Sequence, residues 1–378
     1  MRTVNNVLAG AALTLYLTAP AYAIGPFPNQ PLYLSSAVSP NVMLLVDNSG
    51  SMHNIIQPAG VLVSDFPAVA YRNSNSNYVF ASLANGNISI SAVQEDGCQS
   101  GYKALWSVVD GSLNTKRCYR FPDPVGSEAT RYTGKYLAYI FNTFTAANND
   151  LLAQPDSAVP KTFRMQVARD SAKGIVQANR SMRIGLSTFN APITDGDRGP
   201  GGSITQEIKN LSAVTGVTQA QADQNYASLI SNIDALRAEA NTPLAETYYE
   251  VARYFRGLER YQGSGTGSYT SPIQYRCQKN FGIVVTDGLP THDRSFPSDD
   301  PDRDNPDVDG DNNLPNWDGL QPAVGQAYSD GNAPDDSSRN GEGDTLFLDD
   351  IAKFAFDIDL KNSGNDLAGR SFNDTSNI

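Results

Sequence analysis

The chain has 378 residues, of which 40% are hydrophobic, and it carries a formal net charge of −12. This composition is typical of a soluble globular protein, and the length allows one large domain with insertions or two smaller domains. The negative charge argues against nucleic acids and anionic membrane surfaces as partners.

The first residues have the pattern of a secretory signal peptide. Met1 and Arg2 precede an apolar segment that runs from Val7 to about Leu17, and Ala21-Tyr22-Ala23 has the form of a cleavage site. The apolar segment is too short to span a bilayer. We therefore expect residues 1–23 to be removed and the rest of the chain to be exported, to the periplasm or the outer surface, without a membrane span.

The first strand that we predict ends in a loop of oxygen ligands. Val42–Val46 is a short apolar run, typical of a strand buried on both faces, and Asp47, Ser49 and Ser51 follow it. Open α/β sheets place their sites at the carboxyl ends of such strands, and Mg²⁺ prefers oxygen ligands. The segment therefore predicts a divalent-cation site, although a plain strand-to-loop turn fits the same residues.

Residues 53–160 form a long insertion that is rich in Asn, Ser, Gly and Tyr. Short alternating segments such as Tyr78–Ala81 and Asn87–Ile90 predict strands. The aromatic residues either form a binding surface or pack a small subdomain, and we favour packing. The aromatic residues concerned are Tyr102, Trp106, Tyr119, Tyr132, Tyr136 and Tyr139.

Three cysteines lie in the part of the chain that we expect to be exported, where oxidation is permitted. Their odd number leaves one thiol over, or one whose partner is elsewhere. We expect Cys98 and Cys118 to form a disulfide that closes a local loop in the insertion, and we leave Cys277 unassigned.

Core elements resume after the insertion. Apolar spacing predicts a helix over 162–180, a strand over 183–189, an edge strand over 203–208 and two further helices. The second of these begins at Pro243, which suits a first turn and predicts Thr242 as its N-cap. Phe281–Val285 is another apolar run, which predicts a second buried strand ending in Asp287. Buried strands that alternate with helices predict a doubly wound, mainly parallel α/β sheet.

Residues 292–344 form an acidic insertion, with eight Asp between positions 293 and 311. The spacing Asp307-Val308-Asp309-Gly310-Asp311 resembles the core of calcium-binding loops. The full EF-hand pattern fails, because position twelve, counted from Asn305, is Asn316 and not Glu. A solvated acidic segment fits the same composition. The candidate Ca²⁺ ligands are Asp302, Asp304, Asp307, Asp309 and Asp311.

The loop after the first strand and two distant segments together resemble the metal-ion-dependent adhesion site of von Willebrand factor type A domains. The matching residues are Asp47, Ser49, Ser51, Thr242 and Asp287. The resemblance covers about residues 41–359 and implies a von Willebrand factor A, Rossmann-like domain over 24–378 with two insertions. It also implies that the three hydroxyls and two carboxylates hold Mg²⁺ or Mn²⁺, directly or through water.

The signal peptide, both insertions, Thr286-Asp287-Gly288 and the helical segment from Leu348 to Phe356 resemble the N-terminal part of PilC/PilY type IV pilus tip adhesins. This resemblance implies cell adhesion at a pilus (fimbrial) tip. The implied ligand is an exposed carboxylate of a protein on a host surface or in the pilus, minor pilins included. A β-propeller follows in that group, and type A domains continue with another strand. We therefore expect a fragment whose sheet lacks its last strand.

Two other functions were compared with adhesion. The domain is alternatively a structural pilus-assembly module in which the metal only stabilises loops. An enzyme is disfavoured because Gly-x-Ser-x-Gly is missing and the two histidines, His53 and His292, do not suggest a catalytic relay. We therefore predict no catalytic residues.

Overall fold

The computed structural model describes residues 38–59, 61, 66–81, 88–192, 201–261, 265–288, 290–293, 297, 300, 314, 317 and 347–373. The chain is mixed α/β, and its sheets contain parallel strand pairs, as the sequence predicts. The expected signal peptide and the five candidate Ca²⁺ ligands lie outside the described residues. None of the described helices is long and apolar enough to cross a bilayer.

The first of the sheets has four strands, in the order β10-β9-β1-β11. Its strands are β1 (Asn41–Val46), β9 (Arg183–Phe189), β10 (Gly202–Asn210) and β11 (Asn280–Val285). β1 pairs in parallel with both β9 and β11, whereas β10 is antiparallel to β9. Central β1 therefore delivers its last residue between two other strand ends.

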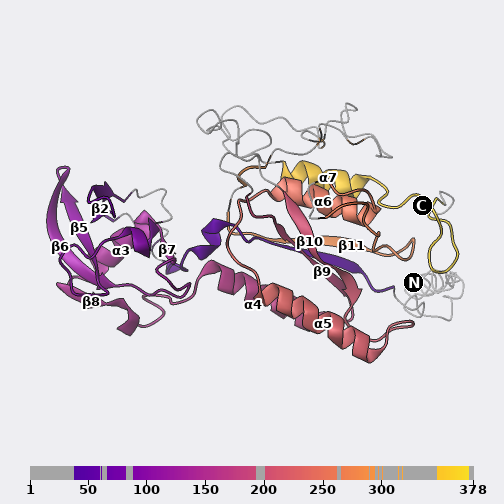
Figure 1. Cartoon of the computed structure of the whole chain (residues 1–378), viewed down its shortest axis with the longest axis horizontal. Helices are drawn as coiled ribbons and strands as arrows, with labels where there is room; N and C mark the ends of the chain where they lie inside the picture. The colour runs from indigo at the N-terminus through magenta and orange to yellow at the C-terminus, as the bar shows by residue number, and fades with distance from the viewer. Residues whose placement is uncertain are drawn as a thin grey trace, which may run out of the picture. The chain divides into compact units, whose positions relative to one another are not determined.

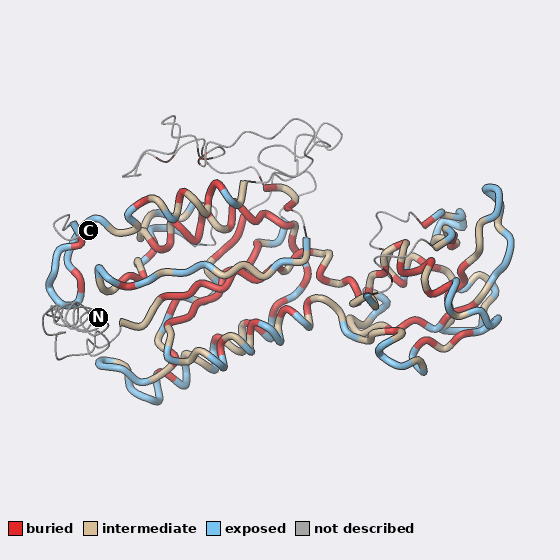
Figure 2. Tube along the Cα trace, turned by 180° about the vertical axis from the view of Figure 1, so that it is seen from behind, coloured by how far each residue is buried: buried red, intermediate tan, exposed pale blue. Residues whose placement is uncertain are grey.

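Two helices cover each face of this sheet (Figure 1). They are α4 (Arg164–Ala178) and α5 (Gln219–Asp234) on one face, and α6 (Leu244–Arg256) and α7 (Leu348–Asp357) on the other. Alternate residues of β1 serve the two layers: Leu44 packs with α4 and α5, and Met43 packs with α6. Because both faces are covered, all six β1 residues are buried, and Figure 2 shows buried residues gathered along the sheet and the helix faces that cover it.

Strand β11 differs from the sequence prediction of a second buried strand. Among the described residues, β11 pairs only with β1, so it is an edge strand. None of its residues is fully buried, and Phe281 keeps 47% of its surface exposed. The expectation of a strand buried on both faces was therefore wrong for β11, because an apolar run does not reveal whether a strand has one neighbour or two.

The insertion contains its own five-stranded sheet, in the order β3-β2-β5-β6-β8. The strands are β2 (Val69–Arg72), β3 (Tyr78–Phe80), β5 (Lys103–Val109), β6 (Ser112–Arg120) and β8 (Asn148–Asp150), with helix α3 (Gly134–Thr143) and the short pair β4 (Ile88–Ser89) and β7 (Arg131–Tyr132). Asp110 and Gly111, both with positive φ, connect β5 to β6. A two-residue Asp-Gly loop of this kind matches the twist of a β-hairpin.

Aromatic side chains fill the core of the insertion. Tyr119, Tyr132 and Tyr136 are fully buried, and the rings of Tyr132 and Tyr136 stack with centroids 5.4 Å apart. Packing is therefore the role of these three residues, as expected. The predicted disulfide between Cys98 and Cys118 is present, with Cα atoms 5.8 Å apart, and Cys277 is a free, exposed thiol.

Candidate metal centre

Parallel pairing of β1 with β11 brings two acidic loops to one edge of the sheet. Val46 lies opposite Val285, and the Asp47 amide donates to the Val285 carbonyl at 2.8 Å. The next residues of both strands, Asp47 and Thr286, therefore meet although they are 239 positions apart in sequence. This is the edge at which open α/β sheets place their sites.

Asp47 is fully buried, and hydrogen bonds fix both of its carboxylate oxygens. Oδ1 accepts from the Ser49 amide at 2.7 Å, and Oδ2 accepts from the Thr286 hydroxyl at 2.7 Å. Burial raises the pKa of Asp47, while these hydrogen bonds act in the opposite direction by stabilising the carboxylate. The result is a rigid acidic group at the base of the loop.

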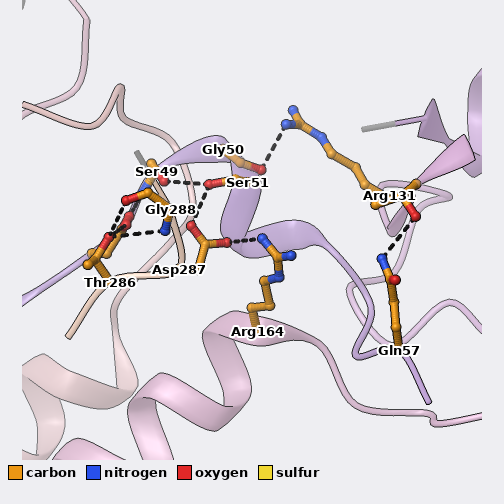
Figure 3. Close-up of polar contacts among 11 residues, drawn as sticks. Ser49, Gly50, Ser51, Gln57, Arg131, Arg164, Thr286, Asp287 and Gly288 are labelled. Carbon is orange, nitrogen blue, oxygen red and sulfur yellow. Dashed lines mark hydrogen bonds and ion pairs between the residues drawn. The ribbon is translucent and has the colours of Figure 1, made fainter. Parts of the chain in front are cut away.

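The two serines of the loop connect Asp47 to Asp287 (Figure 3). The hydroxyl oxygens of Ser49 and Ser51 lie 2.8 Å apart, and Ser51 donates to Oδ1 of Asp287 at 2.8 Å. Ser51 therefore donates its only proton to Asp287 and can only accept from other donors. Four of the five predicted ligands are thus joined by consecutive hydrogen bonds, of which the first runs from the Ser49 backbone amide to Asp47.

An arginine that the sequence interpretation missed also belongs to this set. Nη1 of Arg164, the first residue of α4, lies 2.5 Å from Oδ2 of Asp287. The side chain of Arg164 is 31% exposed, and that of Asp287 is 10% exposed. No pattern near Arg164 could have indicated this contact, because its partner lies 123 residues further along the chain.

Contacts from three other segments hold the loop in place. Asn48 donates to the Phe189 carbonyl at 3.1 Å and accepts from the Phe189 amide at 2.9 Å, which joins the loop to the end of β9. The Gly50 amide donates to the Ala240 carbonyl at 3.0 Å. Arg131 of the insertion donates from Nη1 to the Gly50 carbonyl at 2.8 Å. The loop is therefore preorganised by the fold and not by its own sequence alone.

Thr242, the fifth predicted ligand, is buried. It follows by two residues Ala240, which forms a backbone bridge with Ser49 of the loop. Its amide donates to the Thr291 hydroxyl at 3.1 Å, and its carbonyl accepts from the Thr291 amide at 3.1 Å. Among the described residues, no hydrogen bond joins its hydroxyl to the other four predicted ligands. The structure thus brings four ligands into direct contact and leaves Thr242 outside their hydrogen-bond network.

The predicted capping role of Thr242 was wrong. Helix α6 begins at Leu244 with Pro243 at the cap position, so Thr242 lies one residue too early. Asp293 caps the helix instead, because its two oxygens accept from the Ala245 and Glu246 amides at 2.9 Å each. Complete burial raises the pKa of Asp293 to about 7. Asp293 lies 48 residues beyond Ala245, so the sequence next to the helix could not indicate it as the cap.

The donor set fits a hard cation such as Mg²⁺ or Mn²⁺ better than a softer metal such as Cu or Zn. It offers two carboxylates and the hydroxyls of Ser49 and Ser51, and Mg²⁺ and Mn²⁺ accept such oxygen ligands. The described residues contain no group of three or more His, Cys, Asp or Glu arranged to hold a metal. Two carboxylates alone therefore do not complete a shell, and hydroxyls and water would have to supply the rest.

Comparison with known proteins adds no assignment. None of the family models, curated proteins or solved structures compared with this chain matches it.

Proposed function

We propose that the domain built on the β10-β9-β1-β11 sheet is a von Willebrand factor A-like adhesion module. It would hold Mg²⁺ or Mn²⁺ at Asp47, Ser49, Ser51 and Asp287 and bind an acidic group of a partner protein beside them. The observation that carries this proposal is the run of hydrogen bonds that joins Asp47, Ser49, Ser51 and Asp287 where β1 and β11 end together.

The chemistry of these side chains suits ligand capture better than tight structural binding. Hydroxyls are neutral, so a cation held by Ser49 and Ser51 keeps most of its charge and attracts a carboxylate. The deep burial of Asp47 fixes the inner side of the site. Ser51 and Asp287 are less buried, so the ligand would approach from their side.

Thr242 is included in the proposal through its position. The Ser49 and Ala240 backbones form a parallel bridge, and Thr242 follows Ala240 by two residues. A rotation of its side chain, without any change of the backbone, is the smallest movement that would bring a further hydroxyl toward the site.

The biological role that fits is adhesion by a type IV pilus tip protein. The Cys98–Cys118 disulfide supports an oxidising compartment, which agrees with export to the periplasm, outer surface or pilus tip. The partner would carry an exposed carboxylate, either on a host surface or in a pilus component such as a minor pilin. No membrane-spanning helix occurs among the described residues.

One observation favours the alternative of a structural pilus-assembly module. Arg164 already supplies a positive charge to Asp287, so the protein neutralises part of the acidic edge by itself. In that case a metal would only add stability to the loops. The two functions differ in whether partner binding requires the metal.

Calorimetric metal titration of residues 24–378 tests the adhesion site, with Mg²⁺, Mn²⁺ and Ca²⁺ in separate runs. We expect one ion per chain for the wild type and none for Asp47→Ala combined with Ser49→Ala, because the pair supplies the inner ligands. Ser51→Ala alone is a milder variant, and far-UV circular dichroism checks that each variant folds. A double variant that binds as tightly as the wild type would refute the assignment.

The insertion offers a matched control for the loss of two serine hydroxyls. Ser89 and Ser91 have the same spacing as Ser49 and Ser51, and their hydroxyl oxygens lie 2.6 Å apart. Ser89→Ala combined with Ser91→Ala should leave the titration unchanged, because this pair has no carboxylate of the sheet edge beside it. A Ca²⁺ event that survives in every variant would point to the acidic insertion.

A further inference from the structure

The two oxygens of Asp287 have different partners (Figure 3). Oδ1 accepts the proton of Ser51, which belongs to the loop, whereas Oδ2 contacts Nη1 of Arg164, which belongs to α4. A carboxylate bound to a guanidinium has less negative charge to offer a second cation. Arg164 and a divalent cation therefore make competing demands on Asp287.

The exposure of the two partners indicates which of them can move. Arg164 is 31% exposed, so its guanidinium can swing into water without a charge becoming buried. Asp287 is 10% exposed and is held by Ser51 as well. If the two separate, we expect Arg164 to leave and Asp287 to stay.

The backbone around Arg164 fixes where the side chain starts. The Arg164 amide donates to the Asn54 carbonyl at 2.9 Å, and Ile55 forms an antiparallel bridge with Phe163. The segments by which the chain enters and leaves the insertion are therefore paired with each other, next to the loop in sequence. This pairing leaves the side chain, and not the backbone, as the part of Arg164 that can respond to a cation.

Arg131 provides a contrast within the same site. It is also a guanidinium next to the loop, but it donates to the Gly50 carbonyl and not to a carboxylate. A contact with a neutral carbonyl fixes the loop without reducing the charge of a ligand. Of these two arginines, only Arg164 contacts a predicted ligand of the metal.

We propose that Arg164 is a built-in competitor of the divalent cation, which holds Asp287 and is displaced from it when the cation binds. The inference rests on the proposed function, since it concerns regulation of the same site. It assigns Arg164 a tuning role: the ion pair keeps the acidic edge ordered and sets the cation concentration at which the site fills.

The test compares wild type, Arg164→Gln and Lys173→Gln in a calorimetric titration with Mn²⁺. Lys173 is the matched control, because it lies on α4 but pairs with Asp170 and Asp234, away from the candidate site. We expect Arg164→Gln to bind Mn²⁺ about twofold to fivefold more tightly, as befits the loss of a partly exposed ion pair. Lys173→Gln should bind like the wild type.

Thermal unfolding separates competition from a merely structural ion pair. In EDTA, Arg164→Gln should unfold at a lower temperature than the wild type, because Asp287 has lost its counter-ion. Saturating Mn²⁺ should raise its unfolding temperature by more than that of the wild type. Arg164→Lys, which keeps the charge but not the planar fork, should bind with intermediate affinity and serves if the glutamine variant does not fold.

Each outcome decides the proposal. Equal Mn²⁺ affinities, or weaker binding by Arg164→Gln, would overturn the competition while leaving the metal site in place. Absence of Mn²⁺ binding to both the wild type and Arg164→Gln would overturn the competition and the proposed function together. An ¹⁵N spectrum of the wild type gives a direct check, because the Arg164 Nε signal should shift when diamagnetic Mg²⁺ is added.

Discussion

In the four-stranded sheet, β1 meets β9 and β11 from distant parts of the chain, whereas in the insertion paired residues lie close in sequence. Asp47 and Thr286 are 239 positions apart, while Cys98 and Cys118 are 20 apart and β5 turns directly into β6. The sheet gains a site because it joins loops that share no local sequence. The insertion has its own local strand pairing, aromatic core and disulfide. It can therefore fold as a unit within the chain, after the loop that carries Asp47, Ser49 and Ser51.

If the two regions are independent, damage to the insertion core should leave Mn²⁺ binding at the candidate site unchanged. Tyr119 is fully buried, and its hydroxyl donates to the Phe144 carbonyl at 2.9 Å. Tyr119→Ala should lower the free energy of unfolding of the insertion by about 3–5 kcal/mol, as large-to-small changes of buried aromatic residues do. Urea unfolding followed by near-UV circular dichroism measures this loss, and the Mn²⁺ titration should be unchanged.

Tyr119→Phe is the matched control for that variant. It keeps the ring and removes only the hydrogen bond, so about 1 kcal/mol should be lost. If Tyr119→Ala abolished Mn²⁺ binding although the sheet stayed folded, the two regions would depend on each other. The contrast between local and distant construction would then have no functional meaning.

Removing the disulfide is the next smaller change. The sequence separation of Cys98 and Cys118 is 20, and in the chain-entropy account a loop of that size stabilises the folded state by about 3 kcal/mol. The double change Cys98→Ser and Cys118→Ser should cost about that much in a denaturant titration. Cys277→Ser, which alters an exposed free thiol, should change stability by less than about 0.5 kcal/mol. If the variant without the disulfide were as stable as the wild type, the disulfide would not stabilise the insertion.

Asp293, which caps α6 on the sheet side, should make its own contribution to the pH dependence of stability. Its pKa is about 7 in the folded state against 3.8 for the ordinary carboxyl group. Between these values the folded state holds a proton that the unfolded state has released, so stability should fall as pH rises from about 4 to 7. The slope from this group should reach at most about 1.4 kcal/mol per pH unit.

Asp293→Asn isolates the effect of this group, because asparagine does not titrate in that range. The variant loses one of the two acceptors that bind the Ala245 and Glu246 amides. The wild type minus variant difference in unfolding free energy should therefore shrink with rising pH. A difference that stays constant from pH 4 to 7 would show that Asp293 does not titrate in this window.

Local pattern was sufficient for several parts of the fold and the site. The apolar run of β1, the Asp47-Ser49-Ser51 loop, the span of β9 and the Cys98–Cys118 pairing all follow from residues that are close in sequence. These features are decided by alternation, burial and short loops, which a sequence displays directly.

Other features depended on which segments meet. The edge position of β11 could not be predicted from sequence, and neither could the cap that Asp293 provides for α6. The Arg164–Asp287 ion pair was equally hidden. Each involves partners from different parts of the chain, so no local window contains both of them. The sequence by itself determined which oxygen-bearing side chains follow β1. Tertiary structure decided what surrounds them, because burial and charge at that edge arise only when β1, β11 and α4 come together.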